Sequence, residues 1–88
     1  HKKLLQAVGD PDQRFSEDAL RILRALRFCA TLGFQIEERT ACAAIRLSAS
    51  LDKVSRERVA KELNLTLLGN SAAEALRKYP QLLFAALP

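Results

Sequence analysis

Apolar residues recur along most of the chain with the spacing of an amphipathic helix. The longest such stretch covers residues 16–32, and on a wheel of about 100° per residue its apolar side chains gather on one side. Ser16 suits the N-cap of this helix, and Glu17 and Asp18 follow in the first turn, where the helix dipole favours negative charge. Gly33 suits the C-terminal end. The expected core positions are Ala19, Ile22, Leu23, Leu26 and Ala30.

The same pattern predicts shorter helices in the rest of the chain. One begins with acidic residues and continues with alanines, and another carries apolar residues at helical spacing, namely Val59, Leu63 and Leu67. Serine caps and Gly or Pro stops set the expected bounds. The predicted helices cover residues 37–47, a segment after the Ser55 cap to about residue 68, residues 72–79 up to Pro80, and one or two turns from residue 81.

Short segments separate these helices. Residues 4–8 are apolar and fit a strand or a helix end, and the Gly and Pro of residues 9–12 signal a turn. Residues 34–36 fit an extended connection, and residues 48–50 fit a break. The predicted fold class is therefore all-α, a small helical bundle with a short possible β-strand at the N-terminus.

Composition narrows the class of protein. The chain has 88 residues, 49% of them hydrophobic and 27% charged, which fits one small globular domain and excludes disorder or a collagen-like chain. No apolar run approaches the roughly 18 residues of a membrane span, so we expect a cytoplasmic protein with no membrane partner. Cys29 and Cys42 lack metal-type spacing, and we expect both to be buried apolar residues. The chain begins at His1 and contains no Met, so we expect a piece of a longer protein.

Charged residues on the predicted helix of residues 16–32 suggest a chemistry. Asp18, Arg21, Arg24 and Arg27 recur every three residues. Asp18 and Arg21 can touch, and together they place an acceptor beside donors, which matches the Watson–Crick edges of cytosine and adenine. Uracil and guanine would put a carbonyl against the carboxylate, and an unpaired carboxylate costs about 1–3 kcal/mol. The alternative is an ordinary surface ion pair worth about 0.2–0.5 kcal/mol.

Two motifs resemble the bacterial-type (class II) tRNA nucleotidyltransferases, which are CCA-adding enzymes related to bacterial poly(A) polymerases. The first motif is EDALR at residues 17–21, preceded by AVGDP at residues 7–11 and followed by LRA and RF up to residue 28. The second is ERVAKE at residues 57–62. The resemblance covers about residues 4–68. The mild net charge of +4 fits a nucleic-acid or nucleotide partner.

The resemblance implies a division of the chain and a role for each motif. Residues 1–12 would end the nucleotidyltransferase head, residues 13–70 would form the helical neck, and residues 71–88 would begin the body. The implied roles are base pairing to CTP or ATP for Asp18 and Arg21, phosphate or sugar contacts for Arg24 and Arg27, and a structural role for the motif residues Glu17, Glu57, Arg58 and Glu62. Arg14 is a candidate RNA or nucleotide contact, or a simple loop charge. Arg58 and Glu62 could also pair with each other at i,i+4.

The resemblance also implies what this chain lacks. The metal-binding carboxylates of the family lie in the head, upstream of His1, and Asp10 and Asp12 do not match their motif. We therefore expect no cofactor here, Mg²⁺ in the head of the longer enzyme, and an inactive isolated chain. The expected partners are ATP, CTP and the 3′ end of tRNA or another RNA. Apolar surface at Leu4, Leu5 and the first helix would favour self-association.

Three alternatives remain open from the sequence. A bacterial poly(A) polymerase has the same architecture, and Ala19 slightly favours CCA addition over it. A helix-turn-helix module would place a basic helix in a groove of a nucleic acid, but Glu17 and Asp18 would then face its phosphates. The connection between the predicted helices is also longer than the usual turn of about 3–4 residues. A helical scaffold or dimerisation module is the third.

Overall fold

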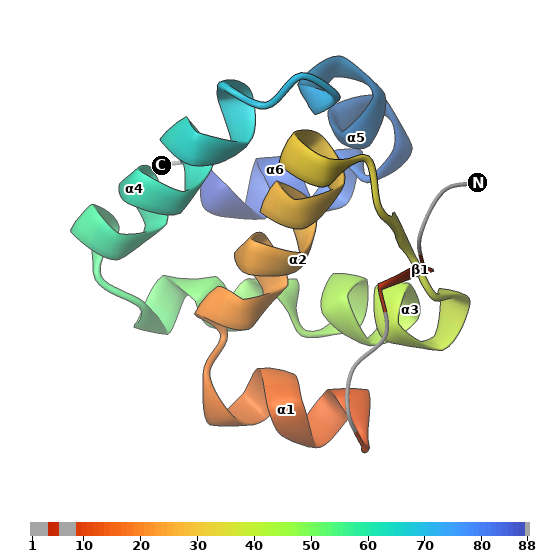
Figure 1. The fold of residues 1–88 in the computed structure, drawn as a ribbon. Coiled ribbons are helices and arrows are strands. Elements are labelled where there is room, and N and C mark those ends of the chain that lie inside the picture. Colours follow the sequence, from red (N-terminus) through yellow and green to blue (C-terminus); the bar gives the residue numbers. More distant parts are fainter. Residues whose placement is uncertain (1–3, 6–8, 88) are drawn as a thin grey trace.

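The computed structural model describes residues 4–5 and 9–87, and these form a small helical bundle, as predicted (Figure 1). Two short strands pair beside the helices. Within the described part, no helix is long and apolar enough to cross a membrane. In chain order the elements are β1 (Leu4–Leu5), α1 (Pro11–Glu17), α2 (Leu20–Leu32), β2 (Gln35–Ile36), α3 (Glu38–Arg46), the 3₁₀ helix η1 (Ser48–Lys53), α4 (Arg56–Leu67), α5 (Ala72–Lys78) and α6 (Pro80–Ala86).

Helix α2 is the central element and is buried on two sides. It runs through the middle of the molecule in Figure 1, with α4 beside it and α6 behind it. Ile22 and Leu26 enter one cluster with α1, α3, α5 and α6, and Leu20 and Leu23 enter a second with η1 and α4. Of the expected core residues, Ile22, Leu23, Leu26 and Ala30 are buried and Ala19 is half-buried. Three further residues of α2 are buried: Ala25 and Cys29 in the first cluster, and Leu20 in the second.

The prediction of one helix over residues 16–32 is wrong, because the chain breaks at Asp18. Helix α1 begins at Pro11, whose fixed φ suits the first helical position, and ends at Glu17. Ser16 therefore lies inside α1 and is not a cap. Asp18 is extended, with φ −154° and ψ 103°, and its Oδ1 accepts a hydrogen bond from the Leu20 N–H at 3.0 Å. Asp18 thus caps α2 and redirects the chain.

Burial gives the reason for this break. Phe15 at the end of α1 belongs to the first cluster, and Leu20 at the start of α2 belongs to the second. The two side chains reach these clusters when the chain changes direction between them. Arg46 of α3 also pairs with Asp12 of α1, across the contact between these two helices. Tertiary packing therefore overrides the continuous helical pattern of the sequence.

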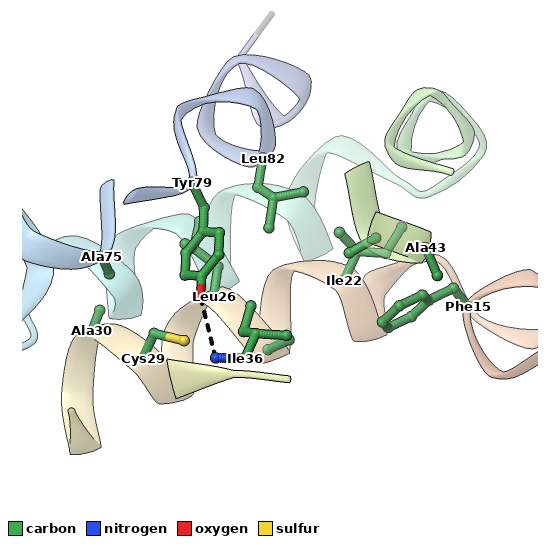
Figure 2. Packing of buried hydrophobic residues seen from close by; sticks show 12 residues of the cluster. Phe15, Ile22, Leu26, Cys29, Ala30, Ile36, Ala43, Ala75, Tyr79 and Leu82 are labelled. Carbon is green, nitrogen blue, oxygen red and sulfur yellow. Dashed lines mark hydrogen bonds between the residues drawn. The ribbon is translucent and has the colours of Figure 1, made fainter. Parts of the chain in front are cut away.

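The end of α2 follows the prediction. Gly33 is left-handed at φ +70°, and its N–H donates to the Cys29 carbonyl oxygen at 3.1 Å. The predicted extended connection of residues 34–36 includes β2, which pairs in parallel with β1. The expected N-terminal strand is therefore confirmed at Leu4–Leu5. Residues 6–8 of the predicted apolar segment lie outside the described residues. The Tyr79 hydroxyl oxygen accepts from the Ile36 N–H at 3.1 Å (Figure 2). This bond ties β2 to the end of α5.

Helix α3 confirms the predicted helix of residues 37–47 and corrects one residue. Thr40 donates to Glu37 Oε1 from its backbone N–H at 2.9 Å and from its hydroxyl at 2.8 Å. These bonds lower the pKa of Glu37 below its ordinary value of 4.5. The buried side of α3 consists of Thr40, Ala43 and Ala44. Cys42 falls on the other side and is exposed, so the prediction that it is buried is wrong.

The turn between α4 and α5 packs tightly on α2. A Cβ on Gly69 would lie 2.4 Å from the Ala30 carbonyl oxygen, so only glycine fits this approach. The Ser71 N–H donates to the same oxygen at 2.7 Å. Helix α4 starts after the Ser55 cap, as predicted, but Leu67 at its end is 52% exposed and is not a core residue.

Candidate functional site

The two motifs, 40 positions apart in the sequence, lie against each other across the α2–α4 contact. Arg24 Nε lies 3.1 Å from Glu62 Oε1, and Arg27 Nε lies 3.4 Å from Glu62 Oε2. At the start of both helices, Arg58 lies 3.6 Å from Asp18 Oδ2. The motif residues of α4 therefore hold those of α2.

Glu62 is a buried carboxylate between two arginines. Its side chain is 6% exposed, whereas those of Arg24 and Arg27 are 46% and 26% exposed. Arg24 donates a hydrogen bond to Oε1, but Oε2 has no hydrogen-bond partner, so Arg27 stabilises it as an ion pair without bond geometry. The pairing of Glu62 with Arg58 considered from the sequence is not the one formed, because Arg58 contacts Asp18 instead. Glu57 is exposed on the first turn of α4.

Asp18 and Arg21 do not form the contact expected from their spacing. Asp18 caps α2 and lies near Arg58, while Arg21 Nη1 donates to Glu17 Oε1 at 3.1 Å and to the Arg14 carbonyl at 3.3 Å. The i,i+3 rule applies within a continuous helix, and the chain breaks between these residues. A carboxylate accepts about four hydrogen bonds, so Asp18, whose side chain is 29% exposed, keeps capacity for a further donor.

Arg14 belongs to an exposed ion-pair cluster. Both Arg14 Nη1 and Arg21 Nη1 lie 3.1 Å from Glu17 Oε1. All three side chains are more than 40% exposed, and such surface pairs contribute about 0–1 kcal/mol each. A ligand with stronger charge can therefore compete for these arginines at small cost.

A groove lies beside Asp18 and encloses about 470 Å³. One side comes from the α1–α2 junction, and the other comes from η1 and the start of α4. Among the predicted site residues, Glu17, Asp18 and Arg58 line it, and Arg21, Arg24 and Arg27 do not. Its lining residues are Ser16, Glu17, Asp18, Ala19, Leu47, Ser50, Lys53, Val54, Ser55 and Arg58.

Sequence reasoning missed the η1 side of this groove. Ser50 and Lys53 belong to no recognised motif, and they face Asp18 only through the packing of η1 beside the α1–α2 junction. The 3₁₀ helix itself was expected only as a break over residues 48–50. No local signal in the sequence could have brought these residues to the site. Across the described residues, no three His, Cys, Asp or Glu side chains gather as a metal site.

Comparison with known proteins identifies the family. A family model described as "Probable RNA and SrmB- binding site of polymerase A" matches residues 33–82. The CCA-adding enzyme of Leuconostoc mesenteroides is 49% identical over 75 residues, which is 85% of this chain and 19% of that protein. The CCA-adding enzyme of Anoxybacillus flavithermus is 42% identical over 88 residues, which is 99% of this chain and 22% of that protein. The CCA-adding enzyme of Lactococcus lactis subsp. cremoris is 51% identical over 69 residues, which is 78% of this chain and 17% of that protein.

The family match covers more than half of the chain, and the chain belongs to this RNA-binding family of polymerase A. Its similarity to the CCA-adding enzymes extends over most of its length and supports the neck region of such an enzyme, as the two motifs implied. The chain spans about a fifth of the length of the curated relatives it matches.

Proposed function

We propose that this chain is the nucleotide-selecting neck of a tRNA nucleotidyltransferase that adds CMP and AMP to an RNA 3′ end. The observation that supports it best is the groove beside Asp18, within a chain 49% identical to a CCA-adding enzyme. Residues 13–70 would form the neck, with the head before them and the body after. The head would supply Mg²⁺, which would hold the triphosphate, and this chain would supply the choice of base.

Base choice would follow from hydrogen-bond complementarity. The exocyclic amine of cytosine or adenine would donate to the Asp18 carboxylate. Arg21 would leave Glu17, an exchange that costs little at an exposed pair, and would donate to the neighbouring ring nitrogen. Uracil and guanine would leave the carboxylate opposite a carbonyl, which costs about 1–3 kcal/mol, or about 5- to 150-fold in affinity.

The capping role of Asp18 shapes the test. Asp18→Ala would remove both the cap of α2 and the base contact. Asp18→Asn keeps a capping oxygen, because Asn caps helices as well as Asp does, but it replaces the carboxylate with an amide that can also donate. Asp18→Asn therefore separates base reading from helix stability. Arg39→Ala, an exposed arginine on α3 outside the groove, is the matched control for Arg21→Ala.

The experiment is a calorimetric titration of the chain and its variants with CTP, ATP, UTP and GTP. We expect CTP and ATP to bind the unmodified chain more tightly than UTP and GTP. Asp18→Asn should erase that preference, Arg21→Ala should weaken CTP and ATP, and Arg39→Ala should change neither. In the full-length enzyme, Asp18→Asn should lower the fidelity of CMP and AMP addition. Equal affinity for all four nucleotides, unchanged by Asp18→Asn, would contradict base reading by this chain.

The choice between CCA addition and poly(A) addition has its own readout. A CCA-adding enzyme must accept both CTP and ATP, whereas a poly(A) polymerase takes ATP alone. The named relatives are CCA-adding enzymes, which favours the first. A chain that binds ATP and not CTP would favour the second.

A further inference from the structure

The groove beside Asp18 has two walls of opposite charge. The junction wall, made of residues 16–19, carries the carboxylates of Glu17 and Asp18. The opposite wall, made of the lining residues of η1 and of the start of α4 and called here the η1 wall, carries the cations of Lys53 and Arg58 and the hydroxyls of Ser50 and Ser55. Of the residues that line the groove, the base-reading proposal uses only Asp18 of the junction wall. A nucleotide also carries an anionic phosphate, and the η1 wall has the complementary charge.

Lys53 is the uncommitted cation of this wall. Arg58 is held by Asp18, but Lys53 is exposed and forms no ion pair with any residue of the described ranges 4–5 and 9–87. An ammonium group brings three donors and no acceptor, so it suits phosphate oxygens. Lys53 also ends η1, where a cation is favoured by the helix dipole. Because Lys53 is exposed and lines the groove, its charge is accessible to a ligand there.

Ser55 adds a second donor to the same wall. Its Oγ accepts from the Arg58 N–H at 3.3 Å as the cap of α4, which leaves its O–H able to donate. The Ser50 hydroxyl is different, because it already donates to the Leu47 carbonyl at 2.6 Å. The groove volume of about 470 Å³ is within the range of about 300–1,000 Å³ that small-molecule sites occupy.

We propose that Lys53 binds a phosphate of the ribonucleotide whose base faces Asp18, with Ser55 as a second donor. The inference rests on the proposed function, since it places the ligand's base on the junction wall. The phosphate belongs either to a free nucleoside triphosphate or to the backbone of an RNA strand. In both cases Lys53 contributes affinity without reading the base, because every nucleotide carries the same phosphate.

The test compares Lys53→Ala with Lys61→Ala. Both residues are exposed lysines, but Lys53 lines the groove and Lys61, on α4, does not. The two variants therefore change the net charge equally. Lys53→Arg keeps the charge and serves as the rescue variant. Each variant is titrated with CTP, with ATP, and with a single-stranded RNA dodecamer at several salt concentrations, after circular dichroism has verified its helical content.

Lys53→Ala should weaken binding by about fivefold, equally for CTP and ATP, and Lys53→Arg should restore it. If the phosphate belongs to RNA, the slope of log K against log salt should fall by about 0.7 for the dodecamer. A loss confined to CTP and ATP assigns the phosphate to the triphosphate, and a loss confined to the dodecamer assigns it to the strand. Equal losses for Lys53→Ala and Lys61→Ala, or none for either, would overturn the proposal.

The result for Lys53→Ala can be distinguished from a failure of the base-reading proposal. Lys53→Ala leaves Asp18 in place, so the preference for CTP and ATP over UTP and GTP should survive it. Asp18→Asn should change that preference and leave the salt slope unchanged. A failed Lys53 result beside an intact Asp18 result therefore overturns only the phosphate site.

Discussion

The burial of Glu62 makes the stability of the chain depend on Arg24 and Arg27 in a non-additive way. Glu62 is 6% exposed at its side chain, and the two arginines are 46% and 26% exposed. Water can rehydrate an arginine that loses its partner, but it reaches the carboxylate poorly. Leaving a buried ion without its partners costs about 3–5 kcal/mol. The loss should therefore be small when one arginine is removed and should exceed the sum of the single losses when both are removed.

We expect Arg24→Ala and Arg27→Ala each to lower the free energy of unfolding by about 1 kcal/mol, because one guanidinium still faces Glu62. The double variant should lose about 3 kcal/mol, which is more than the sum of the single losses. Adding Glu62→Leu to the double variant removes the buried charge and should restore most of the loss.

Urea unfolding followed by circular dichroism measures these differences. With an m value of about 1 kcal/mol per molar, a loss of 3 kcal/mol lowers the midpoint by about 3 M. The double substitution Arg39→Ala/Arg56→Ala removes two exposed arginines and should stay within about 0.5 kcal/mol of the unmodified chain. Strictly additive losses, with no recovery from Glu62→Leu, would refute the reasoning.

Three further predictions concern the fold and the cap. Gly69→Ala should lower the free energy of unfolding by about 1–3 kcal/mol, because its Cβ would lie 2.4 Å from the Ala30 carbonyl oxygen; Asn70→Ala is the control, and equal midpoints would contradict the clash. Burial raises the pKa of Tyr79 above 10.0, so its contribution to stability is complete below pH 10 and is lost as pH rises through the folded value. Absorbance of this single tyrosinate should therefore have a midpoint above 10 in the folded chain, and a midpoint at 10 would contradict it. Asp18→Ala should cost about 1 kcal/mol in thermal unfolding, and Asp18→Ser should recover most of it by restoring a capping oxygen; equal losses would exclude the cap.

Local signals predicted most of the helices. Ser55 caps α4, Gly33 ends α2, and the acidic start of residues 37–47 belongs to α3, as expected. Each of these signals acts through a hydrogen bond or a backbone angle within a few residues. The break at Asp18 could not be predicted in this way, because Ser16 and Asp18 are both good caps. The burial of Phe15 and Leu20 in different clusters decided between them.

For the candidate site too, the sequence predicted some features and tertiary packing decided the others. The motifs at residues 17–21 and 57–62 indicated the family from the sequence, and the family model and the relatives confirm it. The partners of their charges were not predictable. Arg58 and Glu62 are four residues apart and could pair within one helix, yet Arg58 contacts Asp18. Lys53 carried no motif at all, and only the fold brings it to the groove.

The sequence by itself determined the helical segments, the glycine that ends α2 and the family of the chain, because these depend on residue types at short spacings. Only the tertiary structure decided which charge meets which. Several arginines can reach a carboxylate within one helix at almost equal energy. The packing of α4 on α2 removes this degeneracy by burying Glu62 beside Arg24 and Arg27. Burial then turns a weak surface preference into a specific contact, because an unpaired buried charge is costly.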